Sequence, residues 1–173
     1  ATNMDTSADA LLMWLVPSDA AAFVREYRNR GIDVPLLMFQ GVFDPTFQEI
    51  GSELIGEIGL NEYNPGLDNA ANDAFLAAYA AAYDGTPNQT TAFAYTVLQA
   101  IIAGAEASGG DMSVEGLRQA LAGLELDTVI GPASYNADGI ASSNRTIVKA
   151  AEGADGTYVW EPLKTYEGVG APS

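Results

Sequence analysis

Three stretches in the first third of the chain are apolar enough to form strands of a buried sheet. Residues 10–16, Ala-Leu-Leu-Met-Trp-Leu-Val, are apolar throughout and stop at Pro17, which predicts a strand buried on both faces. Residues 34–39 and 55–62 are predicted to form the second and third strands.

Helical patterns fill the two intervals between these strands. Apolar side chains recur at i, i+3, i+4 and i+7 over residues 20–27, and Ser18 or Asp19 can cap the helix that they predict. Asp44 and Pro45 are typical of a cap and a first turn, and they predict a short helix that ends near residue 54. An order of strand, helix, strand, helix, strand indicates parallel pairing with right-handed crossovers.

The middle of the chain carries the pattern of three helices. Residues 68–83 predict a helix capped by Asp68, and residues 113–124 predict another capped by Ser113. Between them, residues 88–108 predict a long helix. Its large apolar residues leave almost no polar stripe, so we expect it to be buried on most sides; they are Phe93, Tyr95, Val97, Leu98, Ile101 and Ile102.

The last part of the chain predicts short strands joined by turns. The strands are expected at residues 128–135, 146–151 and 157–160, with turns at residues 136–139 and 154–156. Residues 165–173 are polar and contain glycine, and we expect a flexible tail there.

Composition narrows the chemistry that this fold can carry. The 173 residues include 23 acidic and 7 basic side chains, a formal net charge of −16, and neither histidine nor cysteine. A chain this acidic repels phosphate backbones and anionic lipid surfaces, so we expect no nucleic-acid partner and no direct membrane insertion. It offers no imidazole or thiolate to act as nucleophile or metal ligand, and no glycine-rich phosphate loop or calcium loop occurs. What remains is carboxylate, hydroxyl, lysine or arginine chemistry, or binding without chemistry. Of these we expect binding, with no catalytic residue, no metal site and no cofactor.

Two predicted strand-to-helix loops are the candidate site. Ligands of parallel α/β sheets bind outside the carboxyl ends of the strands, which here are followed by residues 15–19 and 40–44. The first loop enters a helix N-terminus, whose free N–H groups can hold an anion or a carbonyl. In the second loop, Gly41 allows a close backbone approach and Gln40 can donate and accept hydrogen bonds. The alternative is that the polar residues of both loops are only helix caps and Gly41 only a turn.

Several short motifs occur in an order that resembles one known family. In chain order they are Asp9-Ala-Leu-Leu-Met-Trp14, Gly31-Ile-Asp-Val-Pro35, Phe43-Asp-Pro45, Ala71-Asn-Asp-Ala-Phe75, Ala94-Tyr95, and Ile130-Gly-Pro132 followed by Asn136-Ala-Asp-Gly139. Over residues 8–160 the chain resembles the carboxy-terminal half of a type I periplasmic binding protein, from the branched-chain amino-acid receptor family of ABC transporters.

The resemblance implies a three-layer α/β fold, a parallel sheet with helices on both faces, in an incomplete two-lobe architecture. Residues 1–62 would be part of the second lobe, residues 63–143 a segment that returns to the first lobe, and residues 144–164 crossover strands back to the second. The core of the first lobe and the opening of the second would lie upstream of Ala1. We therefore expect a missing N-terminal half of the same protein as a partner.

The family's ligand lies in a cleft between the lobes. The resemblance implies which residues of this chain would line that cleft. The second-lobe wall would be Leu15, Val16, Ser18, Gln40, Gly41 and Val42, and Thr90 and Thr91 would approach from the first lobe. In amino-acid-binding members the position of Gln40 is commonly acidic and pairs with the ligand's ammonium group. The neutral Gln40 and the apolar Leu15 and Val16 therefore favour a small carboxylate or another apolar-bodied acid over an α-amino acid.

The function that the resemblance implies is that of a receptor without catalysis. It would be a Leu/Ile/Val-binding-like solute-binding protein, periplasmic or extracytoplasmic, with a signal peptide in its precursor, that delivers a small organic ligand to an ABC permease. Two alternatives stay open: a ligand-sensing domain of a signalling protein on the same fold, and, less favoured, a doubly wound α/β enzyme. The missing phosphate loop and the absence of histidine and cysteine argue against the enzyme.

Overall fold

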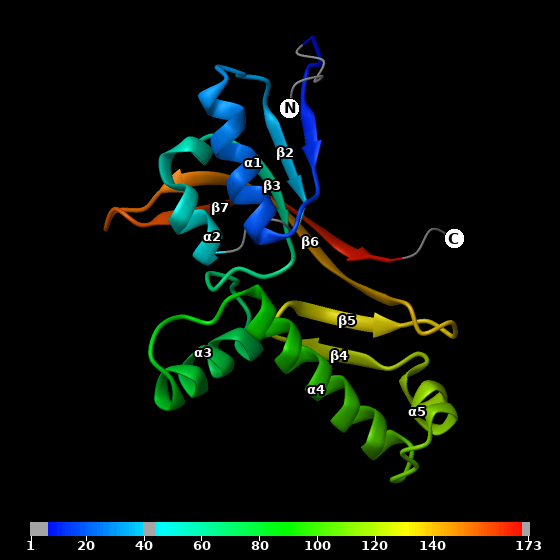
Figure 1. The fold of residues 1–173 in the computed structure, drawn as a ribbon. Helices are drawn as coiled ribbons and strands as arrows, with labels where there is room; N and C mark the ends of the chain where they lie inside the picture. The colour runs from blue at the N-terminus through cyan, green and yellow to red at the C-terminus, as the bar shows by residue number, and fades with distance from the viewer. Residues whose placement is uncertain (1–6, 40–43, 171–173) are drawn as a thin grey trace. The chain divides into compact units, whose positions relative to one another are not determined.

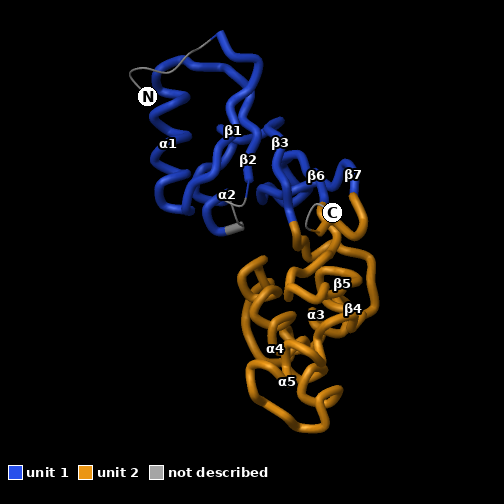
Figure 2. Tube along the Cα trace, turned by 90° about the vertical axis from the view of Figure 1, so that its right-hand side faces the viewer, with its two compact units in different colours: residues 1–61, 146–165 blue, residues 62–145, 166–173 orange. Residues whose placement is uncertain are grey.

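The computed structural model describes residues 7–39 and 44–170, and these form two compact units (Figures 1 and 2). Unit 1 consists of residues 1–61 and 146–165, and unit 2 of residues 62–145 and 166–173. The chain therefore passes from one unit to the other three times.

Unit 1 is built on a parallel sheet. Strand β1 (Leu11–Met13) pairs in parallel with β2 (Leu36–Phe39), which pairs in parallel with β3 (Ile58–Asn61). On the other side of β3 the pairing is antiparallel, with β6 (Ala141–Glu152), and β7 (Tyr158–Val169) pairs with β6. The three predicted strands and their parallel order are thus confirmed, in a sheet whose later strands are antiparallel.

Helices cover one face of this parallel sheet. Helix α1 (Pro17–Asn29), helix α2 (Asp44–Ile50) and a 3₁₀ turn (Gly51–Leu54) lie on the same side of β1, β2 and β3 (Figure 1). Their inward side chains pack with alternate strand residues into one core, because successive residues of a strand point to opposite faces. The fully buried members of this core include Val24, Tyr27, Leu36, Phe47 and Leu54.

Tyr27 and Phe47 show how that core is held. The Tyr27 hydroxyl donates a hydrogen bond of 2.6 Å to the Val34 carbonyl, and burial raises the pKa of Tyr27, which keeps the hydroxyl protonated as a donor. The Phe47 ring lies 4.8 Å from the Trp160 ring between centroids, so α2 is packed against β7.

The opposite face of β1 and β2 is apolar and exposed. Leu12 and Leu37 are register partners on this face, with 70% and 39% of their surfaces exposed, and Trp14 beyond them is 71% exposed. The expectation that residues 10–16 form a strand buried on both faces is therefore wrong for the described chain.

Unit 2 combines three helices with a β-hairpin. The helices are α3 (Ala70–Ala82), α4 (Gln89–Ala107) and α5 (Val114–Leu121). Strands β4 (Glu125–Thr128) and β5 (Gly131–Tyr135) form the hairpin, and β5 continues into antiparallel pairing with β6. A smaller core joins these elements; it consists of Tyr63, Phe75, Ala92, Val129 and Ile130.

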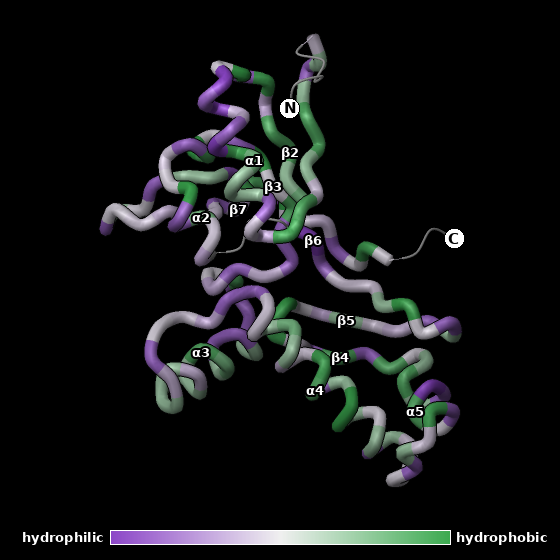
Figure 3. Tube along the Cα trace, in the orientation of Figure 1, coloured by the Kyte–Doolittle hydropathy of each residue, from purple (hydrophilic) through white to green (hydrophobic). Residues whose placement is uncertain are grey.

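Helix α4 places its small residues inward and its large apolar residues outward. Its buried face carries Ala92, Thr96, Ala100 and Gly104, where a Cβ on Gly104 would lie 3.3 Å from Leu121 of α5. The outward residues are 40–58% exposed and form an apolar stripe; they are Tyr95, Val97, Leu98, Ile101 and Ile102 (Figure 3). The helix was expected to be buried on most sides, and the described chain does not bury it so.

Three details of the predicted elements need correction. Helix α1 is capped by the backbone of Val16 and begins at Pro17, because proline lacks the N–H that a first helical residue leaves unpaired; neither Ser18 nor Asp19 is its cap. Asn69, not Asp68, caps α3, and its side chain accepts the Asn72 N–H. The predicted flexible tail is wrong for residues 165–169, which continue β7. Residues 171–173 lie outside the described part.

The fold class is confirmed as α/β, with a mixed sheet and helices flanking it. In the described residues, no helix combines the length and the apolar character needed to cross a membrane.

Phe47→Ala tests the unit 1 core. The substitution should lower the free energy of unfolding by about 3–5 kcal/mol, because it leaves a cavity beside Trp160 and Tyr158. The measurement is equilibrium denaturation with urea. Val114→Ala, at a position 86% exposed on α5, is the control and should change stability by less than about 0.5 kcal/mol. Equal effects of the two substitutions would contradict the assignment of the core.

Candidate functional site

The loop from β1 to α1 ends in an open helix N-terminus. Val16 has extended backbone angles, and the first intrahelical bond runs from the Ala20 N–H to the Val16 carbonyl, at 2.9 Å. The N–H groups of Ser18 and Asp19 precede that bond, so helix geometry leaves them without a partner inside the helix. Such a terminus attracts a carboxylate or a carbonyl oxygen through the helix dipole.

The side chains of this loop are apolar and partly accessible. Leu15 is half-buried against the unit 1 core, whereas 61% of Val16 is exposed and Ser18 is exposed beside it. The structure thus brings Leu15, Val16 and Ser18 together at the carboxyl end of β1, as predicted from the strand-to-helix rule.

An aromatic pair at the same edge of the sheet was not anticipated as part of the site. Trp14 directly follows β1 and Phe39 is the last residue of β2; their ring centroids are 5.0 Å apart in an edge-to-face arrangement. The signal that could have found the pair is its placement, since both residues end neighbouring parallel strands. The pair adds aromatic surface at the carboxyl ends of β1 and β2, on the side of the sheet that carries Leu12 and Leu37.

The second predicted loop cannot be compared with the structure in the same way. Gln40, Gly41 and Val42 lie outside the described residues. They remain predicted ligand-binding residues on sequence grounds alone.

Thr90 and Thr91 lie in the first turn of α4, in unit 2. Asn88 caps this helix: its side-chain oxygen accepts the Thr91 N–H at 3.0 Å and the Thr91 hydroxyl at 3.1 Å. The Thr91 hydroxyl is therefore already engaged in the cap, while Thr90 is exposed. Of the two, Thr90 has the more accessible hydroxyl for a ligand.

The arginines of the chain are already paired with acidic side chains. All five arginines form ion pairs with glutamate: Arg25–Glu49, Arg28–Glu57, Arg30–Glu26, Arg118–Glu115 and Arg145–Glu62. A carboxylate bound by this chain would therefore be held by backbone N–H groups and hydroxyls rather than by a guanidinium.

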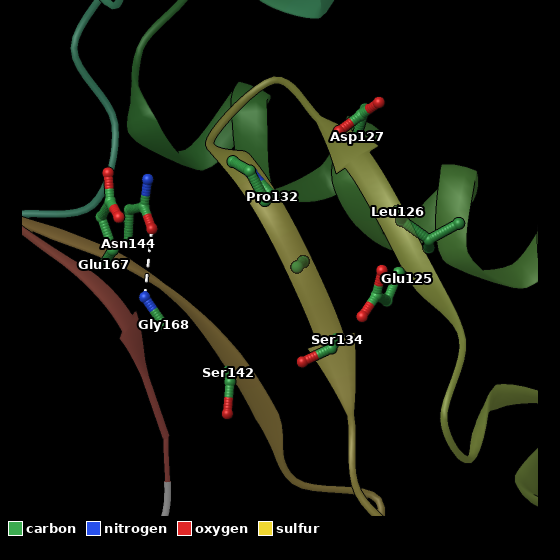
Figure 4. Close-up of a pocket in the computed structure, with 10 residues that line it drawn as sticks. Glu125, Leu126, Asp127, Pro132, Ser134, Ser142, Asn144, Glu167 and Gly168 are labelled. Carbon is green, nitrogen blue, oxygen red and sulfur yellow. Dashed lines mark hydrogen bonds between the residues drawn. The ribbon is translucent and has the colours of Figure 1, made fainter.

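A pocket of about 600 Å³ opens within unit 2 over β4, β5 and β6, and contains none of the predicted site residues (Figure 4). Glu125, Asp127 and Glu167 line it, and on one side the Gly168 N–H donates to the Asn144 side chain at 3.2 Å. Three carboxylates repel an anionic ligand, so the pocket does not suit the expected class of ligand. Within the described residues no three histidine, cysteine or acidic side chains are grouped closely enough to hold a metal ion.

Comparison with known proteins gives one family and one fold. A sequence profile of the periplasmic binding protein family matches residues 3–156. No curated protein sequence matches the chain.

Solved structures similar to this chain are binding proteins of ABC transporters. A Rhodopseudomonas palustris solute-binding protein in complex with 4-hydroxybenzoate is 24% identical, with a TM-score of 0.81, and the match covers 93% of this chain and 46% of that one. A Sphaerobacter thermophilus substrate-binding protein is 22% identical, with a TM-score of 0.83 and coverage of 94% and 46%.

A third similar structure binds amino acids. It is the leucine-, isoleucine-, valine-, threonine- and alanine-binding protein of Brucella ovis, 19% identical, with a TM-score of 0.78 and coverage of 93% and 44%. The chain thus spans less than half the length of each of these relatives.

Asn88→Ala tests the cap that holds the first turn of α4. The loss of both hydrogen bonds to the Asn88 side chain should lower the free energy of unfolding by about 1 kcal/mol, as measured by urea denaturation. Asn88→Asp keeps an acceptor at the cap position and should stay within about 0.5 kcal/mol of the original protein. The assignment of the cap is wrong if the two variants are equally destabilised.

Proposed function

The chain belongs to the periplasmic binding protein family, and on that premise we propose that it is part of an extracytoplasmic solute receptor that supplies a small organic ligand to an ABC permease. The observation that carries the proposal is the family match over residues 3–156, supported by the fold shared with solute-binding proteins of ABC transporters. The role is binding without catalysis, as in the relatives, which are transporter binding proteins.

The proposed ligand is a small carboxylate with an apolar body. The open N-terminus of α1 offers N–H groups to a carboxylate, and Leu15 and Val16 offer apolar surface beside it. The Trp14–Phe39 pair adds aromatic surface at the carboxyl ends of β1 and β2. Similar proteins from Rhodopseudomonas palustris were solved with benzoate, 4-hydroxybenzoate and 3,4-dihydroxybenzoic acid, which fit that description. An aromatic acid is therefore the first ligand to test.

The proposal assigns two sets of residues to the ligand. Leu15, Val16, Ser18 and residues 40–42 would contact it from unit 1, and Thr90 and Thr91 from unit 2. The neutral Gln40 distinguishes the proposed ligand from an α-amino acid, because a buried ammonium group without a carboxylate partner costs several kcal/mol.

We also propose that the chain functions together with an N-terminal half that covers its two exposed apolar surfaces. One is the face of β1 and β2 with Leu12 and Leu37, in unit 1; the other is the apolar stripe of α4, in unit 2. Apolar surfaces of this kind mark interaction sites in folded proteins. The relatives, of which the chain spans less than half, have enough additional polypeptide to cover both.

A thermal-shift titration tests the ligand class. In the complete protein, 4-hydroxybenzoate at a hundredfold excess over its Kd should add about 2.7 kcal/mol of stability, whereas 4-hydroxybenzamide, which lacks the carboxylate, should add almost none. Gln40→Glu should weaken binding of the acid about tenfold and improve binding of leucine. A protein stabilised by leucine but by no aromatic acid would contradict the proposed ligand, and one stabilised by neither would contradict the receptor.

Ile101→Asp tests the missing half. When the chain and the polypeptide encoded upstream of it are produced as two separate chains, we expect them to copurify, and Ile101→Asp should abolish this because it places a charge in the apolar stripe. Val114→Asp changes an apolar residue of α5 that is 86% exposed, against 40% for Ile101, and lies outside the apolar stripe; it should leave copurification intact. The proposal fails if the chain alone is a monomer that binds no hydrophobic dye and does not copurify with the upstream polypeptide.

A further inference from the structure

An ion pair joins the residues at two of the three points where the chain passes between the units. The antiparallel ladder of β3 and β6 ends with the pair Asn61 and Thr146, the last residues of unit 1 on the two strands. The next residues, Glu62 and Arg145, belong to unit 2, and Arg145 Nε lies 2.9 Å from Glu62 Oε1. The register of the two strands thus places these two side chains next to each other.

The second carboxylate oxygen of Glu62 connects the ion pair to α4. Gln89, the first residue of α4, donates from Nε2 to Glu62 Oε2 at 3.4 Å, and Gln89 is 5% exposed. Arg145 is held in turn by the Ser143 hydroxyl and by the Asn144 carbonyl, which accepts at 2.9 Å. Glu62 therefore links a residue of β6 to the turn of α4 that carries Thr90 and Thr91.

The burial of this pair separates it from most of the others. The Glu62 and Arg145 side chains are 10% and 24% exposed, whereas the Arg25–Glu49, Arg30–Glu26 and Arg118–Glu115 pairs are between 41% and 62% exposed. Burial of two charges costs desolvation that their attraction only roughly repays, so such a pair contributes more to a defined geometry than to stability. The contacts of Glu62 with Arg145 and Gln89 indicate that the geometry in question is the position of the start of α4.

The Arg28–Glu57 pair provides a matched comparison within unit 1. Its side chains are 21% and 12% exposed, and the second oxygen of Glu57 accepts the Leu36 N–H at 2.6 Å. Both pairs therefore use one carboxylate oxygen for an arginine and the other for a local donor. They differ in what the donor belongs to: the start of β2 in one case, and the start of α4 in the other.

We propose that Glu62 is a positioning residue for ligand binding, which holds the first turn of α4 through Gln89 while Arg145 holds Glu62. This rests on the proposed function, because Thr90 and Thr91 reach the ligand only if that proposal is correct. The role is specific: the charge pair orients the helix end, and the helix end orients the hydroxyls. Loss of the pair should therefore change affinity more than stability.

Two matched double variants in the complete protein test this role. E62M/R145M and E57M/R28M each replace an ion pair by apolar side chains of similar length, and both should keep the melting temperature within a few degrees. Amide hydrogen exchange in residues 88–92 should become about tenfold faster in E62M/R145M only, because that variant loses the contact that holds the first turn of α4. A tenfold increase in exchange rate corresponds to a modest loss of local protection. In E57M/R28M the faster exchange should appear at Leu36 instead.

Affinity for 4-hydroxybenzoate supplies the second measurement. Its Kd should rise about tenfold in E62M/R145M and stay unchanged in E57M/R28M. Gln89→Met removes only the donor to Glu62, keeps the ion pair, and should reproduce both effects if the double variant fails to fold.

The two measurements keep the proposals distinguishable. Unchanged exchange in residues 88–92, or an equal increase in both double variants, overturns the role of Glu62. Faster exchange there with an unchanged Kd overturns it as well, because the helix end would then not matter to the ligand. If no acid binds even the original protein, the proposed ligand class fails, while the exchange experiment still decides whether Glu62 positions α4.

Discussion

The pairing of β3 with β6 is the constraint on which the arrangement of the chain depends. The two strands are far apart in sequence, and their ladder brings residues 146–149 back beside residues 58–61 after the whole of residues 62–145 has been placed in unit 2. Unit 1 is therefore completed by a segment that arrives late in the chain. Non-local pairing of this kind carries an entropic cost of loop closure, and the packing of Trp160, on the returning segment, against Phe47 of α2 helps to offset it.

Local patterns predicted the elements well, and failed where burial depends on distant polypeptide. The long helix at residues 88–108 was predicted from its run of apolar residues and the glycines that follow it; the structure adds that Asn88 is its cap. The burial of residues 10–16 and of α4 was overestimated because an apolar run predicts burial without identifying what would cover it, and the described residues leave Leu12, Trp14 and the outward side of α4 exposed. Asp68 was predicted as the cap of α3, which is Asn69; the two neighbours cannot be told apart by residue type, because aspartate and asparagine both suit a cap position.

The candidate site was predicted only in part, for a similar reason. The edge of a parallel sheet can be inferred from the order of strands, so the position of Leu15 and Ser18 beyond the end of β1 was predicted. The same order places Trp14 and Phe39 at the ends of neighbouring strands, but the contact of their rings depends on the register of β1 against β2. The Glu62–Arg145 pair depends likewise on the register of β3 against β6. Neither register can be predicted from spacing along the chain. Because all five arginines are paired with glutamates, an acid at the loop between β1 and α1 would be met by backbone N–H groups rather than by a guanidinium.

Helix α4, with alanine and glycine turned inward and valine, leucine and isoleucine turned outward, has a consequence for the life of the chain in a cell. Exposed apolar surface makes a chain prone to aggregation and is a reason why chaperones exist. If the proposed N-terminal half occupies the stripe, the lifetime of the chain would depend on that association as well as on the stability of its own two cores.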